Sequence, residues 1–476
     1  MNKSTSKPIY KAILIACLPA FFSGCNFLQY NAKPIDPVAN TAKFEAKNPA
    51  GDAFNQYLIS NGYTADQLPL KTWGVDELVY CALFFHPDLD VARAQWRAAE
   101  SAELGAAFRP VPNLNTNIAH SNQANEDIKP FAFGLSIDIP LETANKREIR
   151  IENARHLSQA AKLEIAQTAW KLRNQVVQSF NEYQFNQQQI KLISEEQARR
   201  QEIVAIYQKR LSLGAASNVE LSTVKLQLQA TTLELNTANQ NKLVLQSKLA
   251  SNLGLPLVRV REINLINDSV NHPAQPNQLT TADLETSALL NRLDIRIGLE
   301  RYAAAEAKLK LEIAKQYPDL VISPGYAYEF GDRIWSLGLS GLLTLLNKNK
   351  VAIAEATQLR EVEAAQFNAL QEKVISEANI NNAQLIQASS ALENQQQLLM
   401  AQQTNTQRML SRFSAGEIDR LELTYAKLEN NIAEKNLALA YFQYKTTLNQ
   451  LENTLQKPLS ANIDVQKLKG MEKNEP

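Results

Sequence analysis

Within residues 141–213, apolar or small residues recur at alternating steps of three and four from Ile165 to Ile193, at positions such as Leu172 and Val176. Neither this stretch nor residues 342–415 contains a Gly or a Pro. A helix filling either stretch would be about 100 Å long at 1.5 Å per residue. The spacing is typical of coiled coils, so we expect very long helices that pack along their length.

Each long stretch ends at a Gly and is followed by a helix-capping pattern. Gly is common just past a helix C-terminus, because it enters the left-handed region without strain. The residues at this spacing are Gly214, Ser217 and Glu220 in the first stretch and Gly416, Asp419 and Glu422 in the second. Ser-x-x-Glu and Asp-x-x-Glu open a new helix. We therefore expect two helical hairpins, each with a tight turn at its Gly.

The two stretches are copies of one another. Three pairs of landmarks share a shift of 202 residues (347 − 145): Asn145-Lys146 with Asn347-Lys348, Arg210 and Gly214 with Arg412 and Gly416, and Pro256-Leu257 with Pro458-Leu459. A constant shift predicts no net insertion between the landmarks, so the chain is built from a two-fold internal repeat.

Short segments before each long stretch alternate apolar with small or polar residues. In residues 131–139, Phe131, Phe133 and Leu135 lie on one face, while the intervening residues are small or polar. Similar alternation occurs near residues 113–118, 320–328 and 335–340. Such strands are the signature of a transmembrane β-barrel. A soluble hairpin with one buried face is the alternative.

Four strands are too few to close a barrel. An open sheet edge leaves backbone groups unpaired and cannot sit in lipid. The smallest membrane barrels have about eight strands. If the strands span a membrane, several copies of the chain must therefore share one barrel. Two copies would supply the minimum of about eight strands, and three copies would supply twelve.

The N-terminus reads as a targeting segment. Lys3, Lys7 and Lys11 precede a short apolar run that ends in Phe22-Ser-Gly-Cys25. That ending resembles the cleavage box of bacterial lipoproteins, which implies a signal peptide over residues 1–24 and acylation of Cys25, for example with palmitate. An Asp directly after the cysteine would have resembled the inner-membrane retention signal of this lipoprotein class. The residue there is Asn26, which favours the outer membrane. Plain signal-peptide cleavage nearby is the alternative.

Charge and cysteine content narrow the class further. The 49 basic and 49 acidic side chains give a net charge of 0, which becomes −3 once the three signal lysines leave. That balance argues against a nucleic-acid partner. With Cys17 removed and Cys25 acylated, Cys81 has no partner for a disulfide, and we expect it to be a small buried hydrophobe.

No catalytic or cofactor motif stands out. The sequence has no phosphate loop, no His-Glu-x-x-His, no paired cysteines and no nucleophile elbow. The histidines at positions 86, 120, 156 and 272 show no ligand spacing. We therefore expect neither an enzyme nor a cofactor or metal site.

The predicted organisation follows the repeat. Its parts are a signal peptide (1–24), an extended N-terminal arm (25–71), repeat 1 (72–261), a linker (262–279), repeat 2 (280–460) and a polar tail (461–476). Each repeat contains a short helix, two strands and a long helical hairpin, in that order.

Residues 72–460 resemble the TolC-type outer-membrane factors, including their lipoprotein branch. The motifs on which the resemblance rests are His86-Pro-Asp-Leu89, Tyr317-Pro-Asp-Leu320 and the two Arg-x-x-x-Gly turns. The resemblance implies a mainly α fold in which three copies share a twelve-stranded membrane β-barrel and a helical tunnel through the periplasm. It also implies a periplasmic adaptor and an inner-membrane transporter as partners.

The function implied is the outer-membrane channel-tunnel of a tripartite efflux pump, through which small molecules leave passively. A type I protein secretion duct shares the fold, and the inner-membrane partner mainly selects the cargo. A non-conducting coiled-coil lipoprotein of the periplasm is a third reading, but it leaves the four strands unexplained.

In this family the Gly turns form the periplasmic tip, where the tunnel narrows and the adaptor binds. The tip residues here are Arg210, Gly214, Ser217, Arg412, Gly416 and Asp419. By position, Glu220 and Glu422 match acidic tip residues, although both also occupy capping positions. In the best-known member of the family, an Arg of the second hairpin belongs to the network that locks the gate, and Ile418 stands at that position here. Tyr425 stands where that member has a second acidic residue. We therefore expect the closed state to be held by a different set of contacts, involving Asp419 or Arg420. The candidates for the pore constriction are Glu220, Glu422, Arg420 and Tyr425.

Overall fold

A computed structural model describes residues 28–122, 129–266, 281–341 and 348–459. Four parts of the predicted organisation lie outside these residues: the signal peptide, Cys25, most of the linker and the polar tail. The chain separates into two compact units, Met1–Ala46 and Lys47–Pro476. Apart from one short helix, all described elements belong to the second unit.

Short helices occupy part of the segment 25–71, where we expected an extended arm. In the first unit, α2 (Pro37–Glu45) begins after Asp36, whose carboxylate caps its first turn. In the second unit, α3 (Asp52–Ser60) buries Phe54 and an apolar residue four positions later. The expectation was wrong here. A polar composition obscured an N-cap followed by Pro and an apolar pair at helical spacing.

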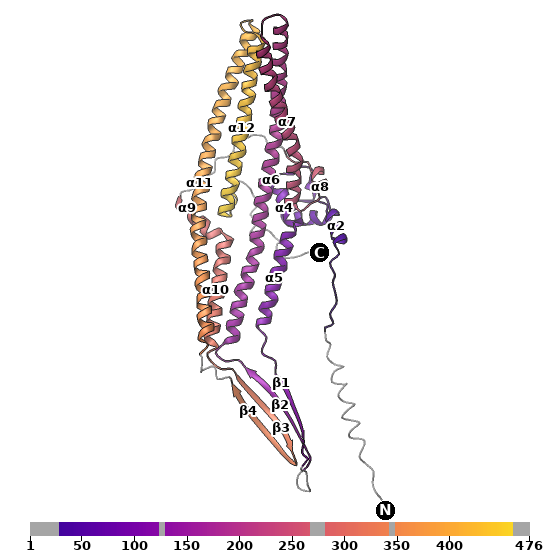
Figure 1. Cartoon of the computed structure of the whole chain (residues 1–476), viewed down its shortest axis with the longest axis vertical. Helices are drawn as coiled ribbons and strands as arrows, with labels where there is room; N and C mark the ends of the chain where they lie inside the picture. The colour runs from indigo at the N-terminus through magenta and orange to yellow at the C-terminus, as the bar shows by residue number, and fades with distance from the viewer. Residues whose placement is uncertain (1–27, 123–128, 267–280, 342–347, 460–476) are drawn as a thin grey trace, which may run out of the picture. The chain divides into compact units, whose positions relative to one another are not determined.

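Long helical hairpins dominate the second unit, as predicted. Its remaining helices are η1 (Ala65–Gln67), α4 (Val75–Phe85), α5 (Pro87–Ala106), α6 (Lys146–Ser212), α7 (Asn218–Leu253), α8 (Leu257–Glu262), α9 (Thr281–Asn291), α10 (Leu293–Ala314), α11 (Lys350–Ser414) and α12 (Arg420–Leu455). Helix α6 packs beside α7, and α11 beside α12 (Figure 1). Helix α12 also packs on α6, so the two hairpins meet along these two helices.

The start of the second hairpin corrects the predicted repeat register. Helix α6 follows two residues with positive φ that end at Asn145, and α11 follows two that end at Asn349. Asn145 therefore corresponds to Asn349, a shift of 204 rather than 202, and α11 has 65 residues where α6 has 67. Residues 347–350 read Asn-Lys-Asn-Lys, so either Asn-Lys pair can be aligned with Asn145-Lys146. The structure uses the second pair, and the side-chain amide of Asn349 there donates hydrogen bonds to the Glu312 carbonyl and carboxylate.

The predicted strands form one antiparallel sheet. They are β1 (Asn113–His120), β2 (Phe131–Leu141), β3 (Leu320–Glu329) and β4 (Asp332–Gly341), in the order β1-β2-β3-β4. Among the described residues, the outer edges of β1 and β4 have no partner strand. By chain connectivity, the sheet lies at the end of the long helices opposite to the Gly turns (Figure 1).

The two faces of the sheet differ in polarity. On one face, Leu135 pairs with Tyr326, which in turn pairs with Trp335, and the Trp335 side chain is 82% exposed. On the other face, Asp138 accepts hydrogen bonds from Asn115 (2.7 Å) and Ser323 (2.6 Å). This alternation agrees with the predicted pattern of apolar and small-polar residues.

The largest core cluster lies where α4 packs against α6 and α7. Leu78, Cys81, Trp170 and Leu249 are buried there. Cys81 is fully enclosed, as expected, and burial raises the pKa of its thiol. Within the described part of the chain, no helix is both long enough and apolar enough to cross a membrane.

Candidate functional site: the tips of the two helical hairpins

The Gly turns have the same backbone geometry in both hairpins. Gly214 has φ +71° and Gly416 has φ +74°. After α6, Ala215 N donates to the Arg210 carbonyl (2.8 Å), and after α11 the matching bond to the Arg412 carbonyl is 2.9 Å long. These bonds satisfy carbonyls that a helix end leaves open. A Cβ at either Gly would meet no atom within 4 Å, so the requirement for Gly is conformational rather than steric.

A complete capping box opens α7. Ser217 Oγ accepts a hydrogen bond from Glu220 N (3.2 Å), and the Glu220 carboxylate accepts from Ser217 N (2.7 Å) and Ser217 Oγ (2.8 Å). Hydrogen bonds from the Ser217 backbone and hydroxyl lower the pKa of Glu220. The Glu220 carboxylate is thus committed to its own helix end.

The matching box at α12 is only half formed. Asp419 Oδ1 accepts from Glu422 N (2.9 Å), but the Glu422 carboxylate is exposed and has no hydrogen bond or ion pair within the described residues. A physical reason is that Glu422 folding back would bring two carboxylates together, whereas the first box contains a neutral Ser. The sequence predicted a capping box at the start of each helix. The structure contains a complete box at Ser217 and half of one at Asp419.

Two ion pairs join the tips of the hairpins. The Arg210 guanidinium pairs with the Asp419 carboxylate, and Arg420 Nε donates to Glu202 Oε1 (2.6 Å). Both pairs connect α6 to the start of α12. Each is partly exposed and stabilises the fold only weakly, by about 0–1 kcal/mol. Arg412 does not join them, because it pairs with Glu417 in its own turn (3.1 Å).

Apolar contacts lie beneath these ion pairs. Ile203, Leu221 and Leu421 belong to a buried cluster shared by α6, α7 and α12. Tyr425 packs against this cluster, and its pKa is raised by burial and by a hydrogen bond with Tyr207. Tyr425 therefore connects helices rather than presenting a charge.

A partly buried charge cluster lies further along the same seam, and the sequence patterns did not predict it. Lys435 Nζ donates to Glu196 Oε2 (2.7 Å) and to Glu234 (3.1 Å), while Arg200 Nε donates to Glu196 Oε1 (2.7 Å). Glu196 is only 4% exposed. The available signal was a lysine at a heptad position, seven residues after the apolar Leu428.

The charges of this cluster hold one another ionised. Burial opposes ionisation of Glu196, but hydrogen bonds from Lys435 and Arg200 outweigh it, and the pKa of Glu196 lies below its ordinary value. Burial likewise opposes the charge on Lys435, but Glu196 and Glu234 outweigh it and raise its pKa. One lysine thus ties together α6, α7 and α12.

A second buried ion pair lies nearer the middle of the long helices. Arg173 on α6 donates to Glu452 on α12 (2.7 Å), and both side chains are 2% exposed. The Arg173 guanidinium also lies over the Trp170 ring, 5.0 Å from its centroid. This pair joins repeat 1 to repeat 2.

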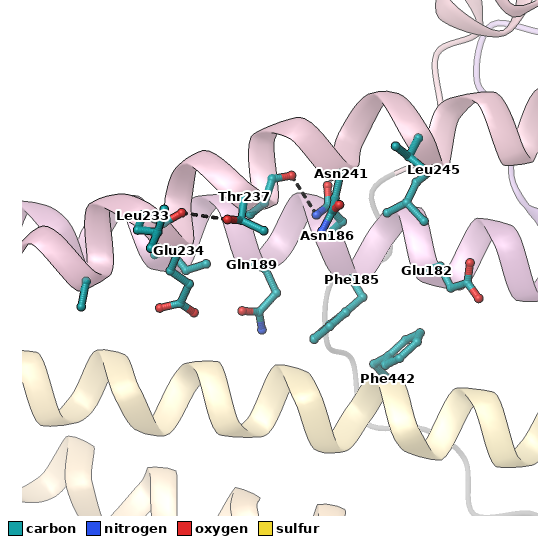
Figure 2. A pocket seen from close by; sticks show the side chains of 14 residues that line it. Glu182, Phe185, Asn186, Gln189, Leu233, Glu234, Thr237, Asn241, Leu245 and Phe442 are labelled. Atoms are coloured by element: carbon teal, nitrogen blue, oxygen red, sulfur yellow. Dashed lines mark hydrogen bonds between the residues drawn. The ribbon is translucent and has the colours of Figure 1, made fainter.

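An apolar groove of about 830 Å³ lies among α6, α7 and α12. Figure 2 shows Phe185 beside Phe442 in its lining, and their rings stack with centroids 4.5 Å apart. The Asn186 amide donates to the Ala238 carbonyl at its wall (3.0 Å). In the described ranges, no cluster of His, Cys, Asp or Glu could hold a metal ion.

Known proteins share this architecture. Residues 78–255 match the family described as outer membrane efflux protein. The cobalt-zinc-cadmium resistance protein CzcC of Cupriavidus metallidurans is 23% identical over 347 residues, which are 71% of this chain and 79% of that protein.

Solved structures show the same fold. The outer-membrane channel OprN aligns with a TM-score of 0.66 at 18% identity, over 90% of this chain and 99% of that one. The outer membrane protein VceC of Vibrio cholerae aligns with a TM-score of 0.66 at 16% identity, over 81% of this chain and 96% of that one. Together with the family match, they confirm the resemblance to outer-membrane factors, whereas membership of the lipoprotein branch stays a prediction.

Proposed function

We propose that this chain is an outer membrane efflux protein and forms the channel-tunnel of a tripartite efflux pump. Three copies would form a twelve-stranded barrel in the outer membrane and a helical tunnel extending into the periplasm. A periplasmic adaptor and an inner-membrane transporter would complete the pump, and acylated Cys25 would add a lipid anchor. Solutes would leave passively, without chemistry in this chain.

The observation that supports this proposal most strongly is a sheet open at both edges. The outer edges of β1 and β4 are unpaired within the described residues, and the sheet has one apolar face. Unpaired backbone groups cannot be placed in lipid, so further strands must cover both edges. Copies of the same chain supply such strands in closed symmetry.

Assembly in detergent tests the proposal. The mature protein is expected to have the mass of three chains by light scattering coupled to size exclusion. A monodisperse monomer with intact strand content by circular dichroism would overturn the proposed tunnel. Conductance of the trimer in a planar bilayer would then separate a channel from a non-conducting lipoprotein.

For the cargo, we propose divalent metal ions, because a relative covering most of the chain is described as a cobalt-zinc-cadmium resistance protein. Deletion of this chain should then sensitise cells to cobalt, zinc or cadmium, and the intact gene should restore growth. Unchanged metal tolerance together with increased drug sensitivity would contradict the choice of cargo but leave the channel standing.

At the tip, we propose that the Arg210–Asp419 and Arg420–Glu202 pairs hold the two hairpins together in the closed state. Both pairs cross from α6 to α12, which is the contact that an opening tip would have to change. We further propose that Glu422 faces the pore. Its carboxylate has no partner in the described part of this chain, whereas that of Glu220 caps a helix.

A further inference from the structure

The first residue of α6 ties this helix to the following repeat. Lys146 is only 6% exposed, and its Nζ donates to the Tyr317 carbonyl (2.6 Å) and to Asp319 Oδ1 (2.7 Å). Tyr317 and Asp319 lie immediately before β3, which pairs with β2, the strand that leads into α6. The contact therefore fixes the start of one long helix to the start of the next strand in the sheet.

The corresponding residue of the second repeat is Lys350. It is the first residue of α11 and follows two residues with positive φ, Lys348 and Asn349, just as Lys146 follows two such residues. Unlike Lys146, it is exposed, and its ammonium group has no hydrogen bond or ion pair within the described residues. The strand that precedes it along the chain is β4, whose outer edge is open. Among the described residues, no further strand of the same chain pairs with β4, so none offers Lys350 the contact that the start of β3 offers Lys146.

The other open edge offers a matching strand start. Pro318-Asp319-Leu320 at the start of β3 has its counterpart in Pro112-Asn113-Leu114 at the start of β1, and each follows a helix and opens a β-hairpin. Asn113 is exposed, and its amide has no partner in the described ranges. Asn113 thus stands where Asp319 stands in the other repeat, with an amide replacing the carboxylate.

We propose that Lys350 of one copy binds the Asn113 side chain and the Val111 carbonyl of the next copy, repeating the contact that Lys146 makes with Asp319 and Tyr317. The inference rests on the proposed function, because it requires the sheet to close with copies of this chain. An ammonium group bonded to an amide lacks the second charge of the internal pair. The joints between copies are therefore weaker than the joint inside each copy.

Zero-length coupling with a carbodiimide tests this contact, since it joins an amine to a carboxylate only when the two touch. Wild type has an amide at position 113, so Asn113→Asp supplies the carboxylate. In the detergent-solubilised full chain, we expect Asn113→Asp to give covalent dimers and trimers on a denaturing gel, with a linked peptide containing residues 113 and 350. Adding Lys350→Arg keeps the positive charge but removes the reactive amine, and should return the yield to the wild-type background.

Asn117→Asp is the matched control, because it places a carboxylate on the same face of β1 but away from the strand start. It should add no link to Lys350. A native trimer without a Lys350-dependent link in Asn113→Asp would overturn this inference and leave the trimer intact. A chain that is monomeric before coupling would overturn the proposed function as well.

The thermal stability of the trimer gives a second readout that does not depend on coupling. The temperature at which trimers dissociate should fall in Lys350→Met. The fall should be larger when Lys350→Met is made in Asn113→Asp, because a carboxylate at position 113 gives the lysine a charged partner, while repulsion from the cross-strand neighbour Asp138 is common to both variants of that comparison. An equal fall in the two backgrounds would show that residue 113 does not bind Lys350.

Discussion

Gly214 and Gly416 hold a backbone conformation that other residues adopt only with strain. We expect Gly214→Val and Gly416→Val each to cost about 1–2 kcal/mol locally, because a Cβ disfavours positive φ. The double variant should form trimers but lose export, measured as cargo accumulation in cells. Gly105→Val is the control, since Gly105 lies on a helix with open space around its Cα and no positive φ. Wild-type export in the double variant would show that the turns neither dock nor gate.

The two tip glutamates allow a comparison by single-atom changes. In a capping box, Gln serves as well as Glu at N3, the third residue of the helix. Glu→Gln therefore removes the charge and little else. We expect Glu422→Gln to weaken the cation selectivity of the channel in planar bilayers, and Glu220→Gln to leave it nearly unchanged. Both variants should keep the melting temperature within a few degrees of wild type. If neither changes selectivity, the constriction lies elsewhere, with Asp419, Arg420 and Tyr425 as the next candidates.

At the scale of elements, the Lys435 cluster gives the seam between hairpins a defined pH window. The pKa of Glu196 is lowered from 4.5, so its contribution is fully present above about pH 4.5 and is lost as pH falls through the lower folded value. The pKa of Lys435 is raised from 10.5, so its contribution is present below that pH and is lost as pH rises through the higher folded value.

Glu196→Gln should therefore reduce stability near neutral pH and flatten the acid side of the stability profile. Loss of hydrogen bonds to a charged group costs about 1.5–3 kcal/mol. Melting temperature measured from pH 3 to 8 would show both effects. Glu429→Gln should leave the profile unchanged, because Glu429 is exposed on α12 and its carboxylate has no hydrogen bond or ion pair within the described residues. An unaltered acid slope in Glu196→Gln would mean that other carboxylates control acid unfolding.

The sequence predicted the elements well where a local signal exists. Helix length followed from the absence of breakers, and the tight turns followed from the φ requirement of Gly214 and Gly416. The register at Asn349 could not be predicted, because two Asn-Lys pairs compete and a distant contact to Glu312 accompanies the observed one. The Arg173–Glu452 pair was also hidden, since its partners lie in different repeats and nothing local marks either as buried.

At the scale of the whole molecule, the strands rather than the lipid should hold the protein in the membrane. We expect Cys25→Ser to abolish acylation and slow maturation, yet leave the protein in the outer-membrane fraction. Lipid chains add to membrane affinity, but a closed barrel does not depend on them. Radiolabelled palmitate and membrane fractionation measure the two effects separately. An unacylated protein found soluble in the periplasm would show that the strands do not span.

The two-residue difference between α6 and α11 has a consequence for symmetry. Both helices run from the sheet junction to a Gly turn, and α6 is longer by about 3 Å at 1.5 Å per residue. Three copies would arrange six turns around one axis. With equal hairpins that ring would approximate six-fold symmetry, but here long helices of two lengths alternate, and only the first turn is followed by a complete capping box. A protein that docks on this ring would find three equivalent positions rather than six. Its rotation about the axis relative to the trimer would therefore be limited to three equivalent orientations.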